Sequence, residues 1–196
     1  MDEVVAFAKR YLQDLYAIEL AFYEVTDDDK YQALVDKFDG YFDMVEGSRK
    51  ERWDMPPKSV AARGIATKKE FSPGTLFLVR QYELPKLGTI YRAYTSQDRH
   101  PGYKSGYFHT LWIQRQKGGL KIVSIDSRCP DCDGTGVLNG KSCRACSGAG
   151  YHFVRGVEIG DPGAPVAVKR VEPPENPADR ADYDSDAPAK KPSKKR

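Results

Sequence analysis

Apolar residues in the first quarter of the chain recur with the period of an α-helix. Over residues 2–24 they fall at steps of three and four, which places them along one helical face. Residues 30–45 repeat this pattern, and the run T-D-D-D at 26–29 ends the first helix and supplies N-cap side chains for the second. We therefore predict two amphipathic helices whose apolar and aromatic faces pack into a hydrophobic core.

From Thr75 the pattern changes to the alternation of apolar and polar positions that is typical of β-strands. Residues 117–119 (K-G-G) are a hairpin-turn signal between two of these segments. Two helices followed by an antiparallel meander indicate an α+β domain, with N-terminal helices packed on one face of a curved antiparallel sheet. The predicted strands are residues 75–83, 88–96, 106–116 and 120–126.

The remaining segments divide the chain further. Residues 46–73 contain the break M-P-P and are compatible with a short helix or an edge strand. Residues 151–159 and 165–171 predict two short strands, which either pair with each other or extend the sheet. From Pro173 the chain is rich in Pro, Ala, Asp and Lys, which predicts a disordered tail. The predicted parts are an α+β domain at 1–127, a zinc-binding hairpin at 128–151, short strands at 152–172 and the tail at 173–196.

Composition limits the classes of function. Hydrophobic residues make up 40% of the 196-residue chain, and no stretch reaches the roughly 20 apolar residues of a membrane span. The start of the chain (M-D-E) lacks the apolar segment of a signal peptide, so we expect a cytoplasmic protein. The net charge of +3 depends on five basic residues among the last seven, without which it would be −2. The folded part is therefore close to neutral and not a basic nucleic-acid-binding body, whereas the tail is a candidate contact for nucleic acid.

One eight-residue phrase occurs twice and contains all four cysteines of the chain. C-P-D-C-D-G-T-G at residues 129–136 is followed fourteen positions later by C-R-A-C-S-G-A-G at residues 143–150. Two C-x-x-C turns joined by a short linker are typical of a structural zinc site, in which four thiolates form a tetrahedron. The predicted ligands of one Zn²⁺ per chain are Cys129, Cys132, Cys143 and Cys146.

The residues beside the cysteines support a metal site. Gly134 and Gly148 allow the backbone to bend through positive φ, and we expect their N–H groups to point at the sulfurs. Four thiolates leave a zinc site with a formal charge of about −2. The basic side chains placed to offset that charge are Arg128, Lys141 and Arg144.

Other chemistries of paired cysteines stay open at the level of the sequence. Disulfides are disfavoured in a reducing compartment. A redox dithiol usually opens a helix, whereas both turns here continue into glycine-rich sequence. An iron–sulfur cluster also uses four cysteines. Zinc-based hydrolysis is not expected, because four cysteine ligands leave the ion no open position.

The repeat C-x-x-C-x-G-x-G resembles that of the cysteine-rich zinc domain of DnaJ-type co-chaperones, and that of small plastid zinc proteins that carry only this module. Both copies match at every defining position, over residues 129–150. The DnaJ module has four copies and two zinc ions, whereas this chain has two copies, enough for one ion. The run H-P-G at 100–102 lacks the aspartate of the J-domain loop, so no J-domain is expected. The resemblance implies a protein or peptide client without recruitment of a DnaK-type partner.

The order of predicted elements over residues 1–127 resembles the nuclear transport factor 2-like (cystatin-like) fold, a cone of helices against a bent sheet. Residues 107–113 and 119–122 are similar to the last hairpin of that family. The fold hosts binding proteins as well as enzymes that use a carboxylate or a His–Asp pair inside the cone, so it does not decide function. The resemblance makes His109 and Asp126 the candidate pocket residues, although a buried, hydrogen-bonded role is favoured for His109. His100 and His152 are weaker candidates for pocket residues than His109 and Asp126.

No nucleophile-elbow, phosphate-loop or dinucleotide motif occurs in a suitable context, and we predict no catalytic residue. The leading hypothesis is a non-enzymatic zinc-binding protein that acts as a protein- or peptide-binding, chaperone-like adaptor. One alternative is a small-molecule-binding protein or enzyme that uses the cone pocket. Another is nucleic-acid binding through the zinc hairpin and the basic tail. The sequence is compatible with a dimer.

Overall fold

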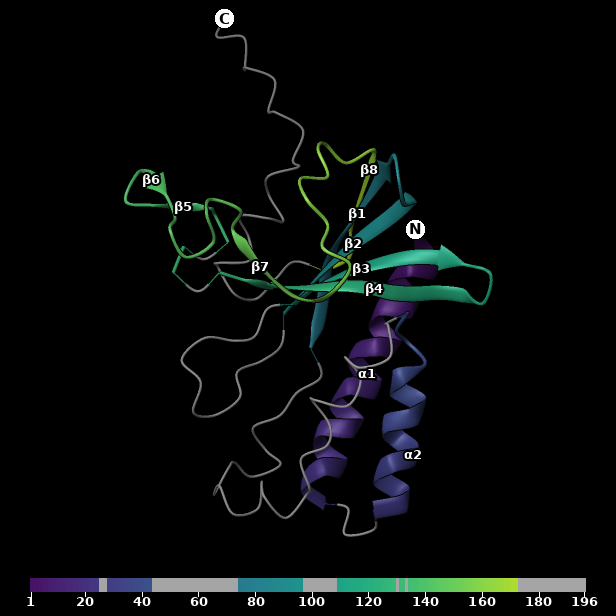
Figure 1. The fold of residues 1–196 in the computed structure, drawn as a ribbon. Coiled ribbons are helices and arrows are strands. Elements are labelled where there is room, and N and C mark those ends of the chain that lie inside the picture. Colours follow the sequence, from purple (N-terminus) through teal and green to yellow (C-terminus); the bar gives the residue numbers. More distant parts are fainter. Residues whose placement is uncertain (25–27, 44–73, 97–108, 130, 133, 173–196) are drawn as a thin grey trace, which may run out of the picture.

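The computed structural model describes the chain except for residues 25–27, 44–73, 97–108, 130, 133 and 173–196. Two helices, α1 (Asp2–Glu24) and α2 (Asp28–Asp39), precede a six-stranded antiparallel sheet (Figure 1). This arrangement confirms the predicted α+β class. The segment 46–73 and the predicted tail lie outside the described residues. The strands of the sheet are β1 (Thr75–Leu84), β2 (Gly88–Ser96), β3 (His109–Gln116), β4 (Gly119–Arg128), β7 (Tyr151–Gly156) and β8 (Ala167–Arg170).

The sheet order is β7-β4-β3-β2-β1-β8. β1 to β4 form the predicted meander, and the two later strands extend it at opposite edges instead of pairing with each other. The chain must therefore cross the width of the meander between β7 and β8 (Figure 1). Residues 157–166, here named the crossing segment, are fixed at both ends by backbone hydrogen bonds. Val157 N–H donates to the Val123 carbonyl at 2.9 Å, and Val166 N–H donates to the Gln81 carbonyl at 2.8 Å.

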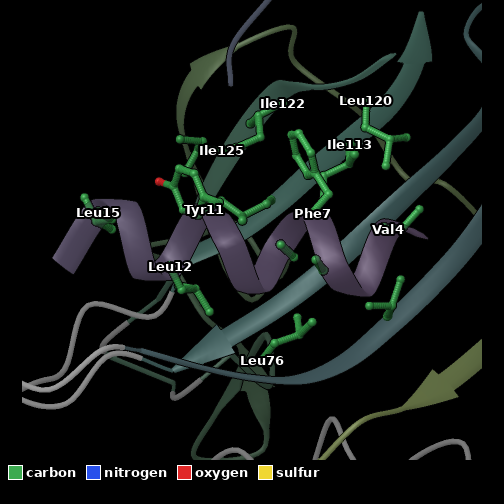
Figure 2. Close-up of a cluster of buried hydrophobic side chains, with 14 of the residues drawn as sticks. Val4, Phe7, Tyr11, Leu12, Leu15, Leu76, Ile113, Leu120, Ile122 and Ile125 are labelled. Carbon is green, nitrogen blue, oxygen red and sulfur yellow. The ribbon is translucent and has the colours of Figure 1, made fainter. Parts of the chain in front are cut away.

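The main hydrophobic core lies between α1 and one face of the sheet (Figure 2). The apolar stripe predicted for the first helix faces the inward positions of the central strands, as the alternation of a strand requires. The buried helix residues are Val4, Phe7, Ala8, Tyr11, Leu12 and Leu15. They pack against Leu76, Val79, Ala93, Leu111, Ile113, Leu120, Ile122 and Ile125. The opposite face of the sheet holds a second cluster around Trp112, against which Ile159 of the crossing segment packs.

The second helix ends earlier than the predicted residue 45. After Asp39 the chain turns onto β4, where Ile122 N–H donates to the Tyr41 carbonyl at 2.8 Å. The Tyr41 hydroxyl donates to Asp14 of α1 at 2.6 Å, which ties this turn to the first helix. None of the helices within the described ranges is long and apolar enough to cross a membrane.

Candidate metal centre

Residues 129–150 form the connection between β4 and β7. β4 ends at Arg128 and β7 begins at Tyr151, and these two residues are paired partners in the sheet. The connection contains two cysteine turns and a small hairpin made of β5 (Val137–Leu138) and β6 (Lys141–Ser142) (Figure 1). The repeat that was predicted as an appended hairpin is therefore the turn between two strands of the main sheet.

The four predicted ligands meet in one place. All four sulfur atoms lie within 4.8 Å of one another, and all four cysteines are buried. The Sγ atoms of Cys129 and Cys143 are 3.9 Å apart, and those of Cys132 and Cys146 are 3.7 Å apart. A zinc–sulfur distance of about 2.3 Å places the sulfurs of a regular tetrahedron about 3.8 Å apart. The sulfur positions therefore fit a single tetrahedral metal ion.

The sulfur–sulfur distances also bear on the disulfide and the iron–sulfur cluster, two alternatives that the sequence left open. All four cysteines are free, and the sulfur pairs lie far beyond the roughly 2.05 Å of a disulfide bond. In a multi-iron cluster the cysteine sulfurs bind different iron atoms and spread over a larger distance than the 4.8 Å that contains all four sulfurs here. The four cysteines could therefore hold a single metal ion. Within the described residues they are the one group of three or more His, Cys, Asp or Glu with clustered ligand atoms.

The two repeats are arranged around the site with matching backbone contacts. Cys129 N–H donates to the Gly150 carbonyl at 2.9 Å, and Cys143 N–H donates to the Gly136 carbonyl at 2.8 Å. Each bond joins the first residue of one repeat to the last residue of the other. The duplication in the sequence therefore appears in space as two equivalent halves that hold each other.

The last glycine of each repeat is required by this close approach. Gly136 has a φ of 72°, and a Cβ added there would lie 2.1 Å from the Gly148 carbonyl oxygen. Gly150 has a φ of 79°, and a Cβ there would lie 2.2 Å from the Gly134 carbonyl oxygen. No other residue tolerates both the positive φ and the contact. The G-x-G spacing thus serves the packing of one repeat on the other.

One backbone hydrogen bond to a sulfur comes from a glycine other than the two expected. Gly148 N–H donates to the Cys143 carbonyl at 2.9 Å, so the expectation that it points at a sulfur is wrong. Gly150 N–H instead donates to the Cys146 sulfur at 3.2 Å. Burial acts to raise the pKa of the Cys146 thiol, but this bond and the hydrogen bonds from the other three cysteines together outweigh burial, so the pKa is lowered. Burial raises the pKa of the Cys129 thiol.

Of the three basic residues predicted to offset the thiolate charge, one is buried beside the site. Arg128 is 8% exposed, and its side chain lies against Gly134, where an added Cβ would meet its Nε at 2.6 Å. Lys141 and Arg144 are exposed. A buried guanidinium compensates nearby thiolates more strongly than an exposed one, because water screens the exposed charge.

One of the candidate pocket residues, Asp126, lies on the sheet face away from α1. Ile125 faces α1, so the next residue, Asp126, lies on the opposite face, where it accepts a hydrogen bond from the Trp112 Nε1 at 2.7 Å. Burial raises the pKa of Asp126 against the opposing effects of Trp112 and Arg92. His109 begins β3 opposite Ser127, and His152 lies on β7. His100 falls outside the described residues.

Sequence reasoning missed a buried polar cluster around Arg92, in the middle of β2. The one signal for it was a charged residue flanked on both sides by apolar and aromatic residues in the middle of the strand. No family model, no curated protein and no solved structure matches this chain. The conclusions about function therefore come from the geometry of the chain itself.

Replacing Gly136 with alanine should disrupt the site, because the added Cβ collides with the opposite repeat. Gly140→Ala is the matched control: Gly140 has a φ of 73°, but no atom lies within 4 Å of an added Cβ. The control should cost only the strain of positive φ, about 1 kcal/mol. Competition with a chelator measures the metal affinity of both variants. Equal affinities in Gly136→Ala and Gly140→Ala would contradict this role of the close contact.

Removing the metal should loosen β7 before the centre of the sheet. The site closes the turn that pairs β7 with β4, whereas β1 and β2 pair through their own short turn at residues 85–87. Hydrogen exchange with and without a chelator tests this coupling. We expect exchange in Tyr151–Gly156 to rise by about tenfold or more and exchange in the β1–β2 ladder to change little. Unchanged protection of β7 after metal removal would show that the strand does not depend on the site.

Proposed function

We propose that the chain is a zinc-dependent protein-binding module, in which the metal centre holds an apolar surface for an extended polypeptide. Zinc is the metal that best fits four thiolates in a tetrahedron joined by paired C-x-x-C turns. With four protein ligands the ion is structural, because no coordination position remains for substrate or water. The resemblance of the repeats to the DnaJ zinc module supports the same type of role.

The position of the exposed apolar side chains carries the proposal. Seven large hydrophobic residues are exposed in the described part of the chain, and all of them lie between Val137 and Val168. Five form what we call the zinc-end surface, on the β5–β6 hairpin, on β7 and just after it: Val137, Leu138, Phe153, Val154 and Val157. The other two, Val166 and Val168, lie at the opposite edge of the sheet. Exposed apolar residues that concentrate at one end of the fold favour an interaction site over random exposure.

The strand at this surface suits an extended partner. β7 is an edge strand, and an edge strand binds an added strand through main-chain hydrogen bonds while neighbouring apolar side chains select its residues. Phe153 and Val154 supply apolar side chains on β7 itself, with exposures of 47% and 41%. A peptide with alternating apolar residues is thus the partner we propose. The need for reduced cysteines fits a reducing compartment such as the cytosol.

Binding of a fluorescent peptide with alternating valine and threonine tests the proposal. The double variant Leu138→Ser/Phe153→Ser should weaken binding by about tenfold, because it removes two apolar contacts from the zinc-end surface. Val166→Ser is the matched control, since this residue is 59% exposed but lies next to β8. Fluorescence anisotropy gives the affinities.

Two outcomes would contradict the proposal. One is equal affinity of the double variant and the Val166→Ser control. The other is equal affinity of the metal-loaded and metal-free chain, since β7 should hold its position only when the centre is closed. A peptide in which every valine is replaced by serine serves as the control ligand.

A further inference from the structure

A buried cluster of charged and aromatic side chains joins four neighbouring strands on the sheet face opposite α1. Its members are Arg92 of β2, Trp112 of β3, Asp126 of β4 and Tyr151 of β7. The side chain of Arg92 is 12% exposed, and that of its ion-pair partner Asp126 is 13% exposed. The cluster therefore ties the edge strand β7 to the centre of the sheet, in addition to the backbone pairing of β7 with β4.

The guanidinium of Arg92 lies against three aromatic rings. Its central carbon is 4.2 Å from the ring centroid of Tyr151, 4.9 Å from that of Trp112 and 5.1 Å from that of Tyr94. These distances are within the range of cation–π attraction, which is stronger where water is excluded. The shortest of the three contacts is the one to the ring on β7.

Hydrogen bonding alone does not account for the position of this guanidinium. Its Nη2 atom donates to Asp126 Oδ2 at 3.3 Å and to Thr110 Oγ1 at 3.4 Å. The Nε atom of Arg92 is buried and has no hydrogen-bond partner in the structure. A buried charged group with an unmet donor depends on its other contacts, so withdrawal of the Tyr151 ring would be unfavourable for Arg92.

This cluster is directly adjacent in sequence to the metal centre. Gly150, the last residue of the second repeat, donates its N–H to the Cys146 sulfur at 3.2 Å. The carbonyl of Gly150 accepts a hydrogen bond from Cys129 N–H at 2.9 Å. Tyr151 is the next residue and begins β7. The backbone that closes around the sulfurs thus also sets the position of the ring on Arg92.

We propose that Arg92 is a positioning residue for the metal centre and acts through the ring of Tyr151. The ring contact requires β7 to be docked on the sheet, and metal binding favours the same docked state. Because the two events favour one state, the ring contact raises the affinity for zinc, and zinc strengthens the ring contact. This inference rests on the zinc binding of the proposed function and is independent of its peptide binding.

The Nε–H resonance of Arg92 in nitrogen-15 NMR tests the contact in the intact zinc-loaded chain. An aromatic ring centred 4.2 Å from the guanidinium carbon alters the chemical shift of the guanidinium protons. A chelator should therefore move this resonance toward its position in Tyr151→Leu, which lacks the ring. Backbone resonances of β1 are the internal control. An unmoved Arg92 resonance would overturn the proposal, and so would a movement shared by β1.

Zinc affinity, measured by competition with a chelator, gives the strength of the coupling. Arg92→Gln and Tyr151→Leu should each weaken zinc binding by about tenfold. The double variant should bind zinc no more weakly than either single variant, because both substitutions remove the same contact. Tyr151→Phe keeps the ring and should bind zinc as tightly as the unsubstituted chain. Arg115→Gln is the matched control, since Arg115 is 56% exposed and pairs with Glu3.

Additive losses in the double variant would contradict the proposal, because two independent structural effects add. Equal zinc affinity of Arg92→Gln and the Arg115→Gln control would contradict it as well. If Arg92→Gln does not fold, the resonance measurement decides. An unsubstituted chain that binds no zinc would overturn the proposed function together with this inference. Zinc binding of equal affinity in all variants would overturn this inference alone.

Discussion

The C-terminal half of the described fold depends on one backbone closure, the hydrogen bond from Cys129 N–H to the Gly150 carbonyl at 2.9 Å. It lies directly after the last pair of the β4–β7 ladder and directly before the four sulfurs. A loop of this length is entropically costly to close. The two-residue strands of its hairpin give it little regular structure, and among its described residues the buried apolar cluster consists of the four cysteines. A metal ion bound by both halves would supply the folding free energy that an apolar core otherwise provides.

The sheet order extends this dependence beyond the metal centre. β7 forms one edge, the crossing segment passes over the face opposite α1, and β8 forms the other edge. Tyr151 is the first residue after the repeat, and its ring lies against Arg92. Tyr151 therefore links the metal centre, through the start of β7, to the buried polar cluster around Arg92.

The sequence predicted the parts whose pattern is local. Helical periodicity gave α1, alternation gave the central strands, and cysteine spacing gave all four ligands that the structure brings together. The partners of β7 and β8 were not predictable, because alternation marks a strand without saying which edge it joins. A local pattern also could not show which glycine N–H reaches a sulfur. That contact depends on how one repeat packs against the other.

The buried polar cluster around Arg92 was missed because it depends on residues that are far apart in the sequence. A single arginine in a strand reads as an exposed position of the alternating pattern. Its guanidinium lies against three rings, one on its own strand and two on other strands. The side of the sheet on which Asp126 lies was not predictable either, because a shift of one residue in the strand register reverses it. Such long-range features need the sheet order before they can be seen.

Native mass spectrometry of the purified chain tests the central claim most directly. The account predicts one zinc ion per chain, removed by a chelator and absent from a Cys143→Ser variant that still contains β1 to β4. A metal-free chain with four titratable thiols, or with a disulfide between the two repeats, would contradict it. In that case the closure between β4 and β7 would need another cause.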